Sequence, residues 1–324
     1  RGLGDVYKRQ MVDAHGRAID YLRLSVTDLC DLRCVYCMPE AGVPHLPHSS
    51  ILRVEECVDI AKTAVELGVR KIRITGGEPL VRRGILEICQ GIGALPGLQE
   101  LCITTNGRGL VSYAAPLREA GVSRLNISLD TLDPDKYRML TRWGQLQDAL
   151  DGIRAAEAAG FAKLKINVVL MGGVNDDEIP ALVELTRDKP YEIRFIELMP
   201  MGECAHWPAS RFIPGERVLE ACPGLAPLPS QGVAERFQMP GYAGTVGLIR
   251  PLSHRFCGSC NRIRVTADGM LKPCLHSDQE IPLRGLGPAE RRAAMEAGIL
   301  QKPLRHHMEE GSSETKRTMN KIGG

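Results

Sequence analysis

Alternation between helical and extended segments is the feature that most constrains how this chain can fold. Apolar residues at helical spacing over residues 54–67 stop at Gly68, and an extended run over residues 71–75 follows. Further helix–strand pairs repeat this order, and an alternating segment over residues 21–27 precedes them all. The later pairs are a helix over 84–95 with a strand over 100–105, a helix over 113–120 with 124–129, a helix over 146–159 with 163–170, and a helix over 179–187 with 191–198.

This order of strand and helix predicts a parallel sheet, because consecutive parallel strands are joined by right-handed crossovers. About six strand–helix units are too few to close an eight-stranded barrel. We therefore expect an α/β fold built on a partial, open (βα)6 barrel. Its functional groups should lie at the carboxyl ends of the strands.

Composition narrows the class of protein. The chain has 324 residues, 44% of them apolar, and a formal net charge of only +2. With 4% aromatic residues and no run of eighteen apolar residues, we expect neither nucleic-acid binding nor a membrane-spanning helix. Eleven cysteines, an odd number, favour reduced thiols in a cytoplasmic protein over a secreted disulfide framework.

Three cysteines lie on a short loop after the first predicted strand, in the spacing Cys30-x3-Cys34-x2-Cys37. This spacing allows three sulfurs to converge on one metal centre. A cubane iron–sulfur cluster has four irons, so three thiolates would leave one iron open to chemistry. A zinc site completed by His45 or His48 is the alternative that this loop alone leaves open.

This loop, with Tyr36 just before its last cysteine, resembles the signature of the radical S-adenosylmethionine (SAM) enzymes. The resemblance implies a [4Fe-4S] cluster whose open iron binds the methionine part of SAM. It implies that one electron from the cluster releases a 5′-deoxyadenosyl radical, and that the protein supplies geometry and shielding. It also implies the partial barrel as the fold.

A second motif, Gly76-Gly77-Glu78-Pro79, ends a predicted strand. On its own it is a turn whose glycines let the backbone approach a ligand closely, while carbonyls and Glu78 can accept hydrogen bonds from an ammonium group. Following the cysteine loop, it resembles the motif that binds the SAM amino group in the same family. By this resemblance the SAM contacts are Tyr36, Gly76, Gly77, Glu78, Asn106, Ser128 and Met199.

Basic residues recur on one face of the predicted strands, where a buried parallel sheet should be almost continuously hydrophobic. Lys71 and Arg73 alternate with isoleucines, and Arg194 lies between Ile193 and Phe195. Several cations facing one cavity are costly unless an anion neutralises them, which predicts a polyanionic ligand such as a triphosphate. Solvated strand ends are the alternative. The chain has no G-x4-G-K-[ST] loop, so side chains would bind the nucleotide.

A second group of cysteines, Cys257, Cys260 and Cys274, lies in a smaller C-terminal segment. Residues 262–266 alternate like a strand, and Asp268-Gly269 is a hairpin signal that would return Cys274 to the other two. Three thiolates are again present rather than four. Zinc with His254 or His276 as its fourth ligand is the alternative here.

The C-x2-C-N-R-x-R arrangement that begins at Cys257, with thirteen residues between Cys260 and Cys274, resembles the GTP 3′,8-cyclases of molybdenum cofactor biosynthesis. The resemblance implies a second [4Fe-4S] cluster whose open iron holds the guanine of GTP. It also implies that the terminal Gly323 and Gly324 enter the active site and serve catalysis. Substrate binding would fall to Arg23, Lys71, Arg73, Thr104, Lys165, Arg194, Arg262, Ile263 and Arg264.

The same resemblance implies a reaction and its partners. The deoxyadenosyl radical would take hydrogen from ribose C3′ of GTP, and the sugar radical would add to guanine C8. The product would be (8S)-3′,8-cyclo-7,8-dihydroguanosine 5′-triphosphate, an early intermediate of molybdopterin. A flavodoxin- or ferredoxin-like reductant protein would supply electrons, cyclic pyranopterin monophosphate synthase would take the product, and the chain could form a homodimer.

We expect four regions along the chain: an N-terminal extension over 1–19, disordered or artefactual in 1–10; the radical SAM partial barrel over 20–213; a proline- and glycine-rich linker over 214–247; and an auxiliary-cluster segment with the Gly-Gly tail over 248–324. Two other functions remain open. A radical SAM peptide-modifying enzyme with an auxiliary cluster would share the first half. A zinc-bound structural protein belongs to another class.

Overall fold

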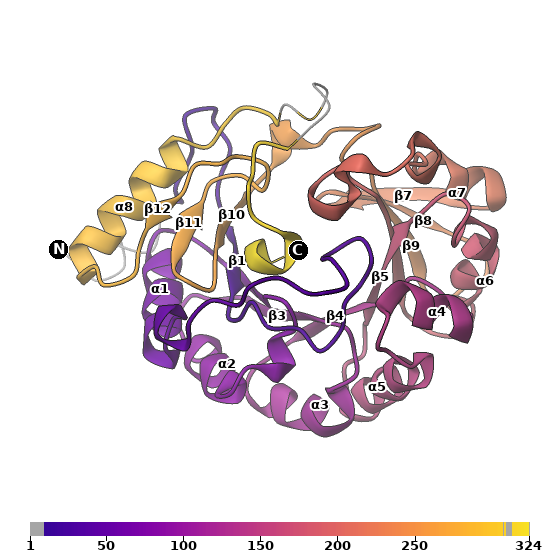
Figure 1. Ribbon diagram of the computed structural model, residues 1–324, viewed down its shortest axis with the longest axis horizontal. Coiled ribbons are helices and arrows are strands. Elements are labelled where there is room, and N and C mark those ends of the chain that lie inside the picture. The colour runs from indigo at the N-terminus through magenta and orange to yellow at the C-terminus, as the bar shows by residue number, and fades with distance from the viewer. Residues whose placement is uncertain (1–9, 307, 309–312, 324) are drawn as a thin grey trace.

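Six strands, each close to its predicted position, pair side by side in chain order and run parallel. They are β1 (Tyr21–Ser25), β2 (Lys71–Thr75), β3 (Glu100–Thr105), β4 (Arg124–Ser128), β5 (Lys165–Leu170) and β6 (Glu192–Glu197). The computed structural model, which describes residues 10–306, 308 and 313–323, confirms the predicted partial barrel. Figure 1 shows the sheet as an open arc with helices on its outer side.

Strands from the second half of the chain extend both edges of this sheet. β9 (Thr245–Ile249) joins β6, and β10 (Arg262–Val265) joins β1, each parallel to its neighbour. Antiparallel strands follow on both sides: β8 (Ala234–Gln238) and β7 (Ala226–Gln231) beyond β9, and β11 (Met270–Lys272) and β12 (Ile281–Pro282) beyond β10. Over the described residues the strand order is β12-β11-β10-β1-β2-β3-β4-β5-β6-β9-β8-β7.

Five helices lie where helical spacing predicts them: α1 (Val54–Glu66), α2 (Ile85–Gly93), α3 (Leu110–Glu119), α5 (Leu146–Ala158) and α6 (Ile179–Glu184). The helix α4 (Pro134–Thr141) was not predicted. The Asp133 carboxylate caps it by accepting hydrogen bonds from the amides of Asp135 and Lys136 at 2.8 and 2.9 Å. The remaining helices are α7 (Glu216–Ala221), α8 (Pro288–Leu300) and α9 (Met319–Ile322).

The hydrophobic core lies between the sheet and its outer helices. Leu22, Ile72 and Ile103 are fully buried and pack in one cluster with helix residues such as Ile60 and Ile88. Because successive side chains of a strand point to opposite faces, the polar residues that alternate with this apolar set point into the arc. The same alternation therefore builds the core and a polar interior.

Residues 214–247 differ from the predicted linker. They hold α7, β7, β8 and the first part of β9, and they continue the barrel sheet. The prolines that indicate a linker, Pro227 and Pro229, lie in β7. β7 is an edge strand, where a missing backbone donor is tolerated.

Part of the predicted N-terminal extension is also structured. Val12 bridges to Ala18, and the Arg17 guanidinium donates to the carbonyls of Cys257 and Leu304 at 2.9 and 3.0 Å. Residues 10–19 therefore pack against the second cysteine segment, while residues 1–9 lie outside the described part of the chain.

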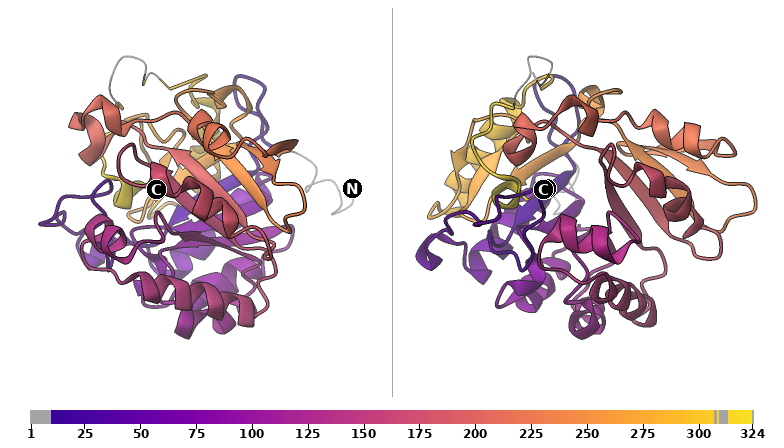
Figure 2. Two further views of the ribbon diagram at one scale, coloured as in Figure 1. Left: turned by 90° about the vertical axis from the view of Figure 1, so that its right-hand side faces the viewer. Right: turned by 45° about the vertical axis from the view of Figure 1, so that its right-hand side comes forward.

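The C-terminal segment extends the β1 side of the arc. Helix α8 packs against α1, and the short α9 lies inside the arc, as Figure 1 and the right-hand view of Figure 2 show. Within the described ranges, none of the helices is both long enough and apolar enough to cross a membrane.

Candidate active site

A cavity of about 540 Å³ lies inside the arc and brings together nearly all the residues that the sequence singles out. All six cysteines of the two groups line it. So do the residues assigned to SAM, which are Tyr36, Gly76, Gly77, Glu78, Asn106, Ser128 and Met199, and eight residues assigned to the substrate, which are Arg23, Lys71, Arg73, Thr104, Lys165, Arg194, Arg262 and Arg264.

Two assigned residues, Ile263 and Gly323, are not among the residues that line the cavity. The Ile263 side chain is 1% exposed and belongs to the hydrophobic core, because it alternates with Arg262 and Arg264 on β10. Gly324 lies outside the described residues. Among the histidines weighed as zinc ligands, His276 lines the cavity, whereas His45, His48 and His254 do not.

The first cysteine loop lies at the carboxyl end of β1, where the helix α4 holds it. The amides of Arg33 and Val35 donate to the carbonyls of Thr141 and Leu140, at 3.1 and 2.9 Å. In return, the Arg142 guanidinium donates to the carbonyls of Arg33 and Met38, both at 2.9 Å. Carbonyls on both sides of Cys34 and Cys37 are therefore fixed by one residue.

The two glycines of the Gly-Gly-Glu-Pro turn allow a close approach to this loop. A Cβ atom on Gly77 would lie 2.3 Å from the Leu29 carbonyl oxygen, and one on Gly76 would lie 2.4 Å from that of Thr27. The Glu78 amide donates to the Leu29 carbonyl at 2.8 Å. The turn is thus hydrogen-bonded to the backbone that precedes the cysteines, a contact that neither motif reveals alone.

Glu78 is buried, and its carboxylate is already well supplied with donors. It accepts hydrogen bonds from the Leu80 amide, the Thr105 hydroxyl and the Asn106 amide, at 3.0, 2.8 and 2.7 Å. Burial raises the pKa of Glu78 to about 7, against the effect of these donors. The Asn106 side chain in turn donates to Asp31 at 2.7 Å, which links this turn to the cysteine loop.

The three thiols of the first loop fit a metal cluster. None of them is in a disulfide, and burial raises the pKa of Cys30 to about 12 and that of Cys37 to about 11. Burial and then the neighbouring Cys37 also raise the pKa of Cys34. Thiols that are buried together beside carboxylates ionise only when a strongly positive group binds them, which is what iron provides.

Tyr36 supports the same end of the cavity. Its hydroxyl donates to Asp130 at 2.7 Å, and the other carboxylate oxygen of Asp130 accepts from the Val169 amide at 2.8 Å. Burial raises the pKa of Asp130 to about 6. Asp130 was not predicted, although it ends the same strand segment as Ser128.

The second cysteine group lies at the opposite end of the strands. β10 is parallel to β1, and Cys260 precedes β10 whereas Cys30 follows β1. β11 is antiparallel to β10 and ends just before Cys274, so Cys274 returns to the same amino end. The cavity therefore runs through the barrel from one cysteine group to the other.

The surroundings of the second group are positively charged. Lys302 is 3% exposed, and its ammonium group donates to the carbonyls of Arg262 and Pro273 at 2.9 and 2.8 Å. Although burial raises the pKa of Cys260, Lys302 and Arg262 together lower it below the ordinary value. Lys302 was not predicted, because it lies in an irregular segment after α8.

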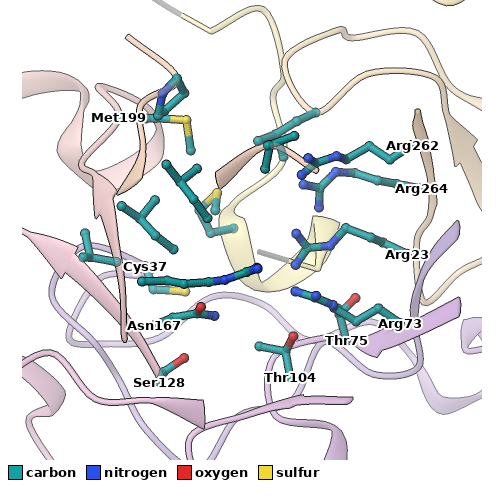
Figure 3. Close-up of a pocket in the computed structure, with 18 of the residues that line it drawn as sticks. Arg23, Cys37, Arg73, Thr75, Thr104, Ser128, Asn167, Met199, Arg262 and Arg264 are labelled. Atoms are coloured by element: carbon teal, nitrogen blue, oxygen red, sulfur yellow. The ribbon is translucent and has the colours of Figure 1, made fainter. Parts of the chain in front are cut away.

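Cations line the cavity between the two groups in rows fixed by strand register. Arg264, Arg23 and Arg73 are direct partners across β10, β1 and β2, and Arg262, Tyr21 and Lys71 form the adjacent row. Figure 3 shows the guanidinium groups of Arg23, Arg73, Arg262 and Arg264 directed into the cavity from one wall. Met199, Cys37 and Asn167 lie on the opposite side.

Two buried or half-buried glutamates hold the other cations. Glu192 pairs with both Lys165 and Arg194, and Glu100 pairs with Lys71 at 2.9 Å and Arg124 at 2.6 Å. Neither glutamate nor Arg124 was predicted. Glu192 alternates with Arg194 on one strand, which is the signal that could have identified it.

The C-terminal tail packs against the wall of the cavity, where Met319 and Asn320 of α9 are lining residues. The Arg264 guanidinium donates to the carbonyls of Ile322 and Gly323 at 3.2 and 2.8 Å. Gly323 has a φ of +69°, and a Cβ atom there would lie 2.2 Å from the Thr75 hydroxyl oxygen. The glycine is therefore required both by its backbone conformation and by the lack of space.

Comparisons with known proteins show which family the chain belongs to. The family model described as Radical SAM superfamily matches residues 24–186, and the one described as Molybdenum Cofactor Synthesis C matches residues 191–312. A GTP 3′,8-cyclase of Alkaliphilus oremlandii is 47% identical over 320 residues, covering 97% of this chain and 100% of that protein. The chain belongs to the GTP 3′,8-cyclase family. A cyclase of Moorella thermoacetica is 46% identical, with 97% and 100% coverage.

Membership of the radical SAM superfamily implies a [4Fe-4S] cluster and SAM. The matched residues, 24–186, include the first cysteine group. Among solved structures, Streptococcus suis SuiB bound to the precursor peptide SuiA superposes with a TM-score of 0.61 at 14% identity. The match covers 94% of this chain and 77% of SuiB. At 14% identity this match establishes a shared fold only. The assignment to the cyclase family depends on the relatives with higher sequence identity.

Proposed function

We propose that this chain converts GTP to (8S)-3′,8-cyclo-7,8-dihydroguanosine 5′-triphosphate, using SAM and two [4Fe-4S] clusters. The observation that carries the proposal is one cavity with a cysteine triad at each end and rows of cations between them. Family membership supports the reaction, and the cations support a triphosphate as the ligand.

At the SAM end, the bound cluster and SAM would supply a 5′-deoxyadenosyl radical that takes hydrogen from the substrate ribose. Around it, Cys30, Cys34 and Cys37 would hold iron. The turn at Gly76 and Gly77 presents backbone carbonyls to the SAM amino group. The surrounding walls would have to keep out water and misplaced neighbours, because either would quench a radical.

At the other end, Cys257, Cys260 and Cys274 would hold the second cluster, and the substrate would lie between the two. Arg23, Arg73 and Lys71 would bind phosphate oxygens from a rigid sheet, so that the ribose is held in one position. Gly323 lies beside Thr75 at the SAM side of these cations. We assign a catalytic role to Gly323 and to Gly324, which lies outside the described residues.

The test is an anaerobic assay of the iron-replete chain with SAM and a strong reductant, in which 5′-deoxyadenosine and nucleotide products are measured with and without GTP. We expect GTP-dependent 5′-deoxyadenosine release and a cyclised dihydro nucleotide. Cleavage of SAM that is indifferent to GTP, without a cyclised product, would refute the cyclase assignment and leave a radical SAM enzyme with another substrate.

A substitution at Arg262 can distinguish GTP binding from SAM binding. The Arg262 Nε atom is buried and has no hydrogen-bond partner among the described residues, so it is available to a ligand. Arg262→Ala should weaken GTP binding about 10-fold or more, because a charged hydrogen bond is lost, while SAM binding stays unchanged. Arg154→Ala, on the exposed face of α5, is the matched control. Equal GTP affinity in both variants would contradict a phosphate role for Arg262.

Two partners follow from the proposed reaction. A flavodoxin- or ferredoxin-like protein would reduce the clusters, and cyclic pyranopterin monophosphate synthase would receive the product. A peptide-modifying enzyme is the second candidate, since SuiB has the same fold. The rows of cations favour a nucleotide over a peptide, because a peptide would leave them without counter-charges.

A further inference from the structure

Tyr21 opens β1 and lies inside the cavity, although no sequence motif includes it. The residue is 7% exposed. By strand register its direct neighbours are Arg262 on β10 and Lys71 on β2. It is thus an aromatic residue placed in the middle of a row of cations.

The Tyr21 ring is in contact with three cations, two from its own row and Arg73 from the adjacent row. The Lys71 ammonium lies 5.0 Å from the ring centroid, and the guanidinium carbons of Arg73 and Arg262 lie at 5.6 and 5.7 Å. An aromatic face attracts cations, so the ring offsets part of the repulsion among them. A phenylalanine would serve that purpose equally well, which leaves the hydroxyl group to be explained.

The Tyr21 hydroxyl is buried and has no hydrogen-bond partner within the described part of the chain. A buried hydroxyl without a partner costs about 1–3 kcal/mol, so an acceptor is expected at this place. Burial raises the pKa of Tyr21, but Arg73 and the cations around it outweigh burial and lower the pKa overall. The surrounding cations therefore make the Tyr21 hydroxyl a strong hydrogen-bond donor to an anion.

We propose that the Tyr21 hydroxyl donates a hydrogen bond to a phosphate oxygen of the bound substrate, and that its ring holds Lys71, Arg73 and Arg262 in position around that phosphate. The proposal rests on the proposed function in taking the triphosphate of GTP as the anion. It adds a tyrosine hydroxyl to a group of substrate residues in which cations predominate. The ring and the hydroxyl have separate roles, which two substitutions can distinguish.

The experiment measures anaerobic binding of GTP, guanosine and inorganic tripolyphosphate to the cluster-loaded protein. Tyr21→Phe keeps the ring and removes only the hydroxyl, and Tyr21→Leu removes both. We expect Tyr21→Phe to weaken GTP and tripolyphosphate about 10-fold with guanosine unchanged, and Tyr21→Leu to weaken both anions further. Tyr113→Phe, on α3 and outside the cavity lining, is the matched control. Unchanged iron content in Tyr21→Phe shows that the fold is intact.

The outcomes separate this inference from the proposed function. Unchanged anion affinity in Tyr21→Phe, or an equal loss for guanosine, would overturn the hydrogen bond to phosphate. If the wild type binds tripolyphosphate as tightly as GTP and releases no GTP-dependent 5′-deoxyadenosine, GTP is the wrong substrate. A loss of tripolyphosphate binding in Tyr21→Phe would then still support the Tyr21 contact.

Discussion

Lys165 is a buried cation whose charge depends on what else occupies the cavity. It pairs with Glu192 at 2.7 Å, and the same carboxylate also pairs with Arg194. Burial, and then Arg194, lower the pKa of Lys165 to about 7 although Glu192 opposes them. A bound triphosphate favours the charged form. We therefore expect GTP binding to take up a proton near pH 8 and to weaken as the pH rises above 7.

Calorimetry of GTP binding in two buffers with different ionisation enthalpies measures that proton uptake. Lys165→Arg keeps a cation that does not titrate, so its GTP affinity should stay flat between pH 7 and 9, and its proton uptake should fall. Lys165→Met should bind GTP about 10-fold more weakly at pH 6.5 and should also lack the pH dependence. The same proton uptake in wild type and Lys165→Arg would mean that another group titrates.

The sequence alone could predict those site residues whose amino-acid type is unusual at their position in a strand or loop. Cysteines in close spacing, paired glycines after a strand, and cations such as Arg73 between isoleucines all conflict with ordinary core packing, which makes them visible in a sequence. Glu192 and Lys302 were missed, because an acid or a lysine at a strand end or in a loop reads as a solvated surface residue. Tyr21 was missed because a tyrosine fits any half-buried strand.

At the scale of elements, α4 is a clamp for the first cysteine loop. Arg142, the residue after α4, has a φ of 62° and, among the described residues, is the one non-glycine with a positive φ. Such backbone strain persists only where surrounding contacts require it. Here the contacts are the two hydrogen bonds from Arg142 to the carbonyls of Arg33 and Met38.

We expect a chelator to remove iron from the first cysteine group about 10-fold faster in Arg142→Ala and Arg142→Gly than in the wild type. Both variants lack the guanidinium group that holds the loop. Glycine also relieves the backbone strain. The measurement uses a background with Cys257, Cys260 and Cys274 changed to alanine, so that all bound iron belongs to the first group. Arg138→Ala, exposed on the same helix, is the control. Wild-type iron retention in Arg142→Gly would contradict the clamp, because this variant lacks the guanidinium group.

Elements with strong periodicity were predictable, and those set by tertiary contacts were not. The strand over 71–75 matches β2, because its alternation is undisturbed. The helix α4 was missed, since it is short and begins with Pro134. β7 was read as a linker, because its prolines are allowed only by an edge position that depends on the whole sheet.

At the scale of the whole molecule, the two ends of the cavity differ in charge. Carboxylates, among them Glu78, Asp31 and Asp130, raise the pKa of the first cysteine thiols in addition to burial. At the second group, Lys302 and Arg262 lower the pKa of Cys260. Nearby cations stabilise the more negative, reduced state of a cluster, whereas nearby anions disfavour it. Clusters bound as proposed would therefore be a weaker electron acceptor at the first cysteine group and a stronger one at the second.

We expect the first cluster to have the more negative reduction potential, which suits an electron donor to SAM. The measurement is an EPR-monitored redox titration, without SAM, of two variants that each lack one cysteine triad. Lys302→Met should lower the potential of the second cluster, on the order of 50 mV, because a buried positive charge is removed from its surroundings. Lys316→Met, an exposed residue near the same end of the chain, should leave it unchanged. Two results would contradict this prediction: a second cluster with the more negative reduction potential, or a second cluster whose potential is the same in Lys302→Met as in the wild type. Either would show that the charges around the thiols do not set the direction of electron flow.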